Sequence, residues 1–141
     1  MTRQWEDNLA ENPRKKLIYV KEYDMKGHEN EGWISEEKYA NLYYPQSLKM
    51  LKKEGIHGDA IGQGVAMWSI TFDKLMQRYD NNLSEINREI ETGIRRYGHC
   101  VKTNGKSECE FQKKDLEKWK KSRKDLRQNH IRLLKVKIED D

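Results

Sequence analysis

A basic segment near the carboxyl end of the chain is the clearest place where residue types and spacing could bind a ligand. Phe111 to Ile138 holds 11 Lys and Arg against 3 Asp and Glu, although the whole chain of 141 residues carries a formal charge of only +4. Positive charge concentrated in one segment attracts anionic groups such as phosphates. We expect the anion-binding residues to be Lys113, Lys114, Lys120, Lys121, Lys124 and Arg127.

Phosphates from two sources would suit this segment. Each Lys or Arg close to an anionic membrane contributes about 1 kcal/mol of binding, and a nucleic-acid backbone would use the same charges. Trp119 is the one aromatic residue well inside the basic segment, so stacking on bases has little support. We therefore predict peripheral binding to an anionic phospholipid surface. The alternatives are a small helical RNA- or DNA-binding protein, such as a ribonucleoprotein subunit, and a purely structural helical partner.

The sequence gives little support for metal binding, nucleotide binding or nucleophilic catalysis. His99 and Cys100 are adjacent and Cys109 follows nine residues later, which matches no zinc-binding spacing. The glycines between Gly55 and Gly64 lack the Gly-Lys-Ser/Thr of a P-loop, and no nucleophile elbow is present. We predict a non-enzymatic protein with no catalytic residues, metal site, cofactor or small-molecule substrate.

The elements that would position the basic segment follow from apolar spacing. From Val65 to Tyr97 the apolar residues recur every three or four positions, which predicts one helix of about 50 Å. A second helix is expected over about 107–138, where Arg123 and His130 interrupt the apolar seam. We expect the core or dimer contacts of the long helix to come from Trp68, Phe72, Leu75, Tyr79, Leu83, Ile86 and Ile90.

The rest of the chain predicts shorter helices and loops. Leu17 to Val20 could form a strand, but no convincing partner strand is evident, so Lys15 to Lys26 is predicted helical. Gly27 to Gly32 and about 55–64 are predicted loops, the second because four glycines cluster there. The predicted fold is one all-α domain over residues 1–141. It would be an elongated, coiled-coil-like antiparallel bundle.

Two residues between 35 and 45 give local signals for where helices begin. Ser35 is a predicted helix N-cap, with Glu36 and Glu37 in the first turn. Pro45 should kink or restart that helix.

Helices of unequal length would leave apolar surface exposed, so we expect a homodimer held mainly by the long helix.

The location of the protein is inferred from what the sequence lacks. No apolar run is long enough to cross a bilayer, and the polar stretch Met1 to Ala10 does not resemble a secretory signal. Without a sign of secretion, Cys100 and Cys109 are predicted to be free thiols. A cytoplasmic protein, peripheral to a membrane, is the resulting expectation.

Three patches of the sequence share a pattern with a known family. They are Ser35 to Leu42, then Ala66-Met67-Trp68 followed by Phe72, Leu75 and Leu83, and the Lys-rich stretch Asp115 to Leu126. In their order and spacing they resemble the F-BAR (FCH) family of crescent-shaped, membrane-binding helical dimers. The resemblance covers about 35–126, and the family's domain is about twice the length of this chain. It implies an all-helical dimer that binds phospholipid through basic residues in a cytoskeletal or membrane-remodelling setting.

Overall fold

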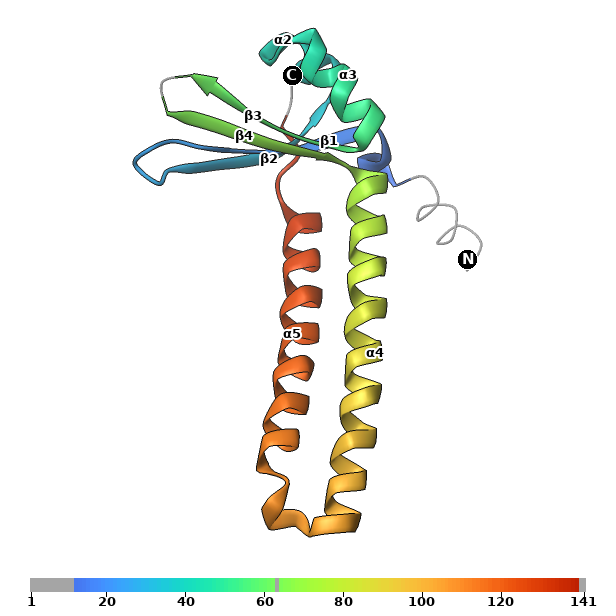
Figure 1. Ribbon diagram of the computed structural model, residues 1–141. Coiled ribbons are helices and arrows are strands. Elements are labelled where there is room, and N and C mark those ends of the chain that lie inside the picture. Colours follow the sequence, from blue (N-terminus) through green and yellow to red (C-terminus); the bar gives the residue numbers. More distant parts are fainter. Residues whose placement is uncertain (1–11, 63, 140–141) are drawn as a thin grey trace. The chain divides into compact units, whose positions relative to one another are not determined.

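The computed structural model describes residues 12–62 and 64–139, and it divides into two compact units. The first unit comprises Met1–Met76 with Val136–Asp141, and the second is Gln77–Lys135. The first unit is built on a four-stranded antiparallel sheet (Figure 1), so the prediction of an all-α, coiled-coil-like bundle is wrong. The all-helical fold implied by the F-BAR resemblance is wrong for the same reason.

The sheet has the strand order β2-β1-β4-β3. Its strands are β1 (Leu17–Tyr23), β2 (Glu29–Ser35), β3 (Ile56–Gly62) and β4 (Val65–Thr71). In the central register, Tyr19 of β1 lies opposite Trp33 of β2 and Ile70 of β4. The strand at Leu17 therefore has two partners, and the predicted helix over Lys15 to Lys26 does not form.

The predicted loop at Gly27 to Gly32 is correct only at its start, because β2 already begins at Glu29 after a tight turn. The Asp24 carboxylate accepts hydrogen bonds from the backbone N–H groups of Lys26 and His28, each at 2.9 Å, and Gly27 has a φ of +81°. These backbone bonds hold the pKa of Asp24 below its usual value. The strand that follows begins Glu-Asn-Glu-Gly. Because this end of β2 is partly exposed, it lacks the apolar alternation that marks a strand.

Two short helices follow β2. Ser35 caps α2 (Glu36–Leu42), because its Oγ accepts a 3.1 Å hydrogen bond from the Lys38 N–H. Pro45 restarts the chain as α3 (Pro45–Glu54), as the sequence predicts. The predicted loop at 55–64 is wrong, since Gly55 ends α3 with a φ of +76° and β3 then begins at Ile56.

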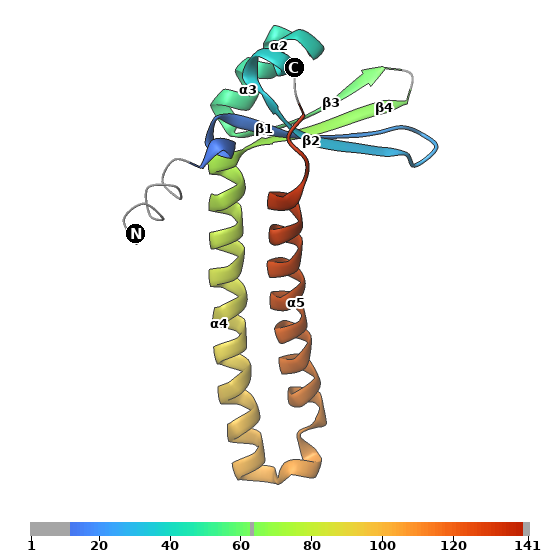
Figure 2. The same cartoon turned by 180° about the vertical axis from the view of Figure 1, so that it is seen from behind.

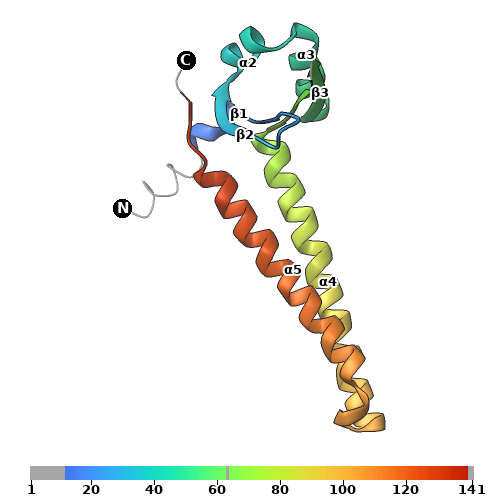
Figure 3. The same ribbon diagram turned by 90° about the vertical axis from the view of Figure 1, so that its left-hand side faces the viewer.

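Helices α2 and α3 cover one face of the sheet (Figure 3). The buried cluster on this face consists of Ile18, Val20, Ile34, Tyr39, Leu51 and Met67. The Tyr39 hydroxyl lies 3.0 Å from Oγ of Ser69, so a buried polar group on the helix is satisfied by one on β4.

Aromatic rings line the other face of the sheet. Trp33, which is fully buried, lies 5.6 Å from Tyr19 and 6.1 Å from Phe72 between ring centroids. The Arg14 guanidinium, from the short 3-10 helix η1 (Pro13–Lys16), lies 6.0 Å from the Trp33 ring. The backbone of Trp33 also exchanges hydrogen bonds with Lys137 and Glu139, so the segment after the last helix pairs with β2.

The second unit is a helical hairpin. It contains α4 from Gln77 onward and α5 (Glu110–Lys135), joined by η2 (Lys106–Glu108), and Figures 1 and 2 show the two helices antiparallel and side by side. Helix α4 spans Phe72–Asn104, so it begins later and ends later than the predicted Val65 to Tyr97. The error at its start arose because β4 carries apolar side chains on both faces and therefore shows no clear alternation.

The predicted contact residues of the long helix fall into two groups. Phe72, Leu75 and Ile90 are buried in α4, whereas Tyr79, Leu83 and Ile86 are half-buried. Trp68 is half-buried but lies in β4, where its ring packs 6.0 Å from that of Tyr19.

The prediction of free thiols is wrong, because Cys100 and Cys109 form a disulfide. Cys100 lies in the last turns of α4 and Cys109 directly precedes α5, so the reversal of the chain brings their Cα atoms to 5.9 Å. Both residues are buried, with exposed fractions of 6% and 0%. The disulfide therefore fastens the turn of the hairpin.

We expect the double variant Cys100→Ser/Cys109→Ser to lose about 2–3 kcal/mol in free energy of unfolding, because closing a loop of this length restricts the unfolded chain by about that amount. Denaturant unfolding followed by circular dichroism would measure the loss. The reduced wild type should match the variant. An oxidised wild type no more stable than the variant would mean that the crosslink adds nothing to the hairpin.

Candidate functional site

The side of α5 that faces α4 carries apolar residues and two polar residues that contact α4. Leu116, Trp119, Leu126 and Leu133 are buried or half-buried at heptad spacing. A Cβ atom built on Gly93 of α4 would lie 3.2 Å from Cδ1 of Leu116, so the absence of a side chain at Gly93 lets the helices approach closely there.

The two polar interruptions of this seam have partners on α4. Nη1 of Arg123 donates a 3.1 Å hydrogen bond to Oδ1 of Asn87. The His130 ring stacks on Tyr79 with 3.8 Å between centroids and 8° between planes. Burial lowers the pKa of His130, and the nearby charge of Asp80 opposes this only in part. Neither Arg123 nor His130 therefore belongs to the exposed basic surface.

The lowered pKa of His130 predicts a pH-dependent stability. The folded state binds fewer protons than the unfolded state, so the free energy of unfolding should fall as the pH drops below the ordinary histidine value of 6.5. His130→Phe keeps a ring against Tyr79 but cannot titrate. Unfolding midpoints at a series of pH values should show a shallower acid loss for the variant. Parallel profiles would contradict this assignment.

The predicted anion-binding residues all lie on the solvent side of α5. All six are exposed. Lys113, Lys120, Lys124 and Arg127 follow spacings of seven, four and three residues, which place them in one row along the helix, and Lys114 and Lys121 form the adjacent row. We call this surface the basic face.

The cations of the basic face are not paired with acidic side chains of the described residues. Within residues 12–62 and 64–139, none of the six makes a salt bridge to an acidic side chain. Glu117 lies among them by spacing and reduces the net charge of the face by one. From Lys113 to Arg127 the face extends about 21 Å along the helix, so several phosphates could be contacted together.

Two of the residues considered for metal binding, His99 and Cys100, lie at the turn of the hairpin. They line a cavity of about 300 Å³ there together with Arg96 and Asp115. Cys100 is oxidised, and a disulfide sulfur is not a zinc ligand. Across the part of the chain that the structure describes, no group of three or more His, Cys, Asp and Glu residues is placed to hold a metal ion.

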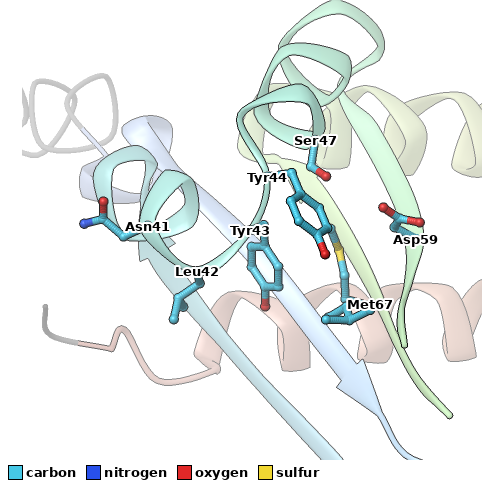
Figure 4. Close-up of a pocket in the computed structure, with 8 residues that line it drawn as sticks. Asn41, Leu42, Tyr43, Tyr44, Ser47, Asp59 and Met67 are labelled. Atoms are coloured by element: carbon cyan, nitrogen blue, oxygen red, sulfur yellow. The ribbon is translucent and has the colours of Figure 1, made fainter. Parts of the chain in front are cut away.

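A second cavity, missed in the sequence, opens in the first unit where α2 meets α3. It measures about 300 Å³ and is lined by Asn41, Leu42, Tyr43, Tyr44, Ser47, Asp59, Ile61 and Met67 (Figure 4). These residues come from the end of α2, the α2–α3 connection, the first turn of α3, β3 and β4, so only the folded unit brings them together. We call this cavity the tyrosine pocket.

Hydrogen bonds and packing fix the rings near this pocket. The Tyr43 hydroxyl donates to Oε1 of Glu22, and the Tyr43 ring lies 4.8 Å from that of Tyr39 between centroids. Burial, together with the Glu22 carboxylate, raises the pKa of Tyr43, and burial raises the pKa of Tyr39. Both phenols therefore stay protonated and neutral near pH 7.

Comparisons with family models, with curated proteins and with solved structures found no match to this chain. The helices of the structure bear on whether the chain could cross a membrane. None of the helices in the described part of the chain combines the length and the apolar character that crossing a bilayer requires.

Proposed function

We propose that the protein binds anionic phospholipid surfaces peripherally through the basic face of α5. The observation that carries this proposal is the row of exposed cations on the outer side of a helix whose inner side is fixed against α4. In this proposal the site is a rigid charged surface, and no catalytic step is assigned to it.

The strength of such binding follows from the number of cations. At about 1 kcal/mol each, six residues in contact with an anionic surface would contribute about 6 kcal/mol, a dissociation constant of about 4 × 10⁻⁵ M. This affinity suits reversible, salt-sensitive association. The half-exposed Ile131, at the same helical position as Lys113 and Lys124, adds an apolar contact on that surface.

The proposal includes a cytoplasmic location, because the anionic leaflet faces the cytoplasm. Disulfides are rarely kept in that compartment. The form that meets the membrane would then carry reduced Cys100 and Cys109. The basic face begins at Lys113 and is formed within α5, so reduction should leave it intact.

The direct test is co-sedimentation of the wild-type protein with phosphatidylserine-containing vesicles and with phosphatidylcholine vesicles, at about 0.1 M and about 0.5 M salt. A parallel titration uses double-stranded RNA. We expect binding to the anionic vesicles that weakens at the higher salt. If the protein binds RNA but not the anionic vesicles, the partner of the basic face is a nucleic acid and not a phospholipid. Binding to neither at low salt would leave the face as a merely solvated surface.

We further propose that the protein forms a homodimer through its helical hairpin. A pair of helices leaves seam residues such as Leu83, Ile86, Trp119 and Leu126 only half-buried, and Ile94 is 52% exposed. A second hairpin would cover them in a four-helix arrangement.

Sedimentation equilibrium at micromolar concentration should therefore give about twice the monomer mass. Ile94→Asp, which places a charge on an exposed apolar position of α4, should shift the equilibrium to monomer while the circular dichroism of the hairpin is kept. A wild type that sediments as a monomer contradicts the proposed dimer.

A further inference from the structure

We propose that the tyrosine pocket binds a small organic ammonium ion. This inference is independent of the basic face, which lies in the other unit. Among the described residues that line the pocket, Asp59 is the one with a charged side chain, and the remainder are aromatic, apolar or neutral polar. A cavity of about 300 Å³ with an apolar lining and one fixed charge suits a small ligand of opposite charge.

The carboxylate of Asp59 is held where it can meet a cation. Its Oδ1 accepts a 2.8 Å hydrogen bond from the Ala60 N–H, which restricts the side chain on β3. Together with burial, the charge of Asp59 raises the pKa of Tyr39, whose ring packs against that of Tyr43 beside the pocket. A second carboxylate, Glu22, accepts from the Tyr43 hydroxyl and adds negative potential beside the ring. An anionic ligand would be repelled by both groups.

Aromatic and sulfur groups supply the rest of an ammonium site. The ring of Tyr44 is 64% exposed and that of Tyr43 is half-buried, and both line the pocket with Met67 (Figure 4). The negative π face of a tyrosine attracts a cation within about 6 Å of its centroid. Met67, which is 2% exposed, contributes a polarisable thioether that tolerates alkyl groups.

The exposure of Tyr44 also argues for a ligand. A large aromatic side chain held at 64% exposure beside a cavity gains little from folding, whereas it would gain contact area and a cation–π interaction when the cavity is filled. Leu42, at 57% exposure, borders the same cavity from the end of α2. An alkylammonium ion would pack its methyl groups against these side chains and place its charge toward Asp59.

The experiment compares choline with its uncharged isostere 3,3-dimethylbutan-1-ol. Titration of the full chain is followed by the ¹³C-methyl NMR signal of Met67, assigned with Met67→Leu. We expect choline to shift the Met67 signal saturably and to bind about tenfold more tightly than the isostere, because only choline carries the charge. Equal affinity of the two compounds, or no shift with either, would overturn the proposal.

Variants separate the charge from the ring. Asp59→Asn and Tyr44→Leu should each weaken choline binding about fivefold to tenfold. Both sites are exposed, so the fold should survive, and circular dichroism verifies this. Glu37→Gln is the matched control, since it removes one exposed carboxylate of the same unit that does not line the pocket. An equal effect of Glu37→Gln would show that only the general field of the unit attracts the cation, and the proposed site would be wrong.

The same ammonium group could come from a free molecule or from a lipid headgroup. Short-chain dihexanoylphosphatidylcholine, used below the concentration at which it forms micelles, distinguishes the sources. If this lipid shifts the Met67 signal at a lower concentration than choline does, the pocket binds a phosphocholine headgroup. If choline is the tighter ligand, because the added phosphate is repelled by Asp59 and Glu22, the pocket takes the free ion.

Discussion

Lys120→Glu together with Lys124→Glu is expected to weaken binding to phosphatidylserine-containing vesicles at least tenfold. The two residues are four positions apart and share the exposed basic face, so the double reversal lowers the charge of one surface by four units. Loss of two cations alone removes about 2 kcal/mol of attraction, and the new carboxylates add repulsion. Vesicle co-sedimentation at about 0.1 M salt measures the change, and thermal unfolding should show that the hairpin remains folded.

A matched control for this reversal exists in the other unit. Lys49→Glu together with Lys53→Glu changes the net charge by the same amount, again on exposed helical residues four apart, but on α3. This control should lower vesicle binding less than threefold, through the weaker effect of net charge alone. If both double variants lose binding equally, the membrane responds to overall charge, and the assignment of α5 as the binding surface would have to be withdrawn.

The parts of the fold that were predicted correctly are those with a strong local signal. The last helix was expected over about 107–138 and occurs as α5 (Glu110–Lys135), because its polar and apolar residues alternate with a helical period. Ser35 and Pro45 each carry a local backbone preference that does not depend on the rest of the chain. The exposure of the basic face likewise follows from the position of the seam opposite to it.

The sheet was missed because its strands lack the pattern that identifies strands. β4 is apolar on both faces, and its residues Val65 and Trp68 fit a helical period that continues into α4 at Phe72. β2 and β3 carry glycine and acidic residues in place of a regular apolar alternation. Each pairs with its neighbour in a hairpin, whereas the central pairing of β1 with β4 joins strands that are distant in the sequence, so no short window of sequence reports it. The tyrosine pocket combines residues of α2, α3, β3 and β4, and it could not have been anticipated without the assembled sheet.

The disulfide was missed for a different reason. The thiols were assigned from the expected cellular compartment, whereas their pairing depends on distance in the folded chain. A helix end at Asn104 and a helix start at Glu110 bring Cys100 and Cys109 within crosslinking reach. The predicted helix end at Tyr97 placed Cys100 in a turn and Cys109 at the start of the helix predicted over about 107–138, so the distance between the two residues did not follow from the sequence.

Trp33→Ala should cost about 3–5 kcal/mol in free energy of unfolding, the largest loss that we expect from a single substitution. The indole has no exposed surface, and it contacts the rings of Tyr19 and Phe72 and the guanidinium of Arg14. Truncation would leave a cavity between β1, β2 and the first turn of α4. Denaturant unfolding followed by circular dichroism measures the loss.

Phe111→Ala is the matched control, because it also removes an aromatic ring but from a side chain that is 78% exposed. We expect it to change the free energy of unfolding by less than about 0.5 kcal/mol. The comparison tests where the core of the first unit lies. The long helix was the expected centre of the chain, but the largest fully buried side chain is that of Trp33 on β2, which pairs with the segment that follows α5. A small loss for Trp33→Ala, similar to that of Phe111→Ala, would show that this sheet face does not hold the unit together.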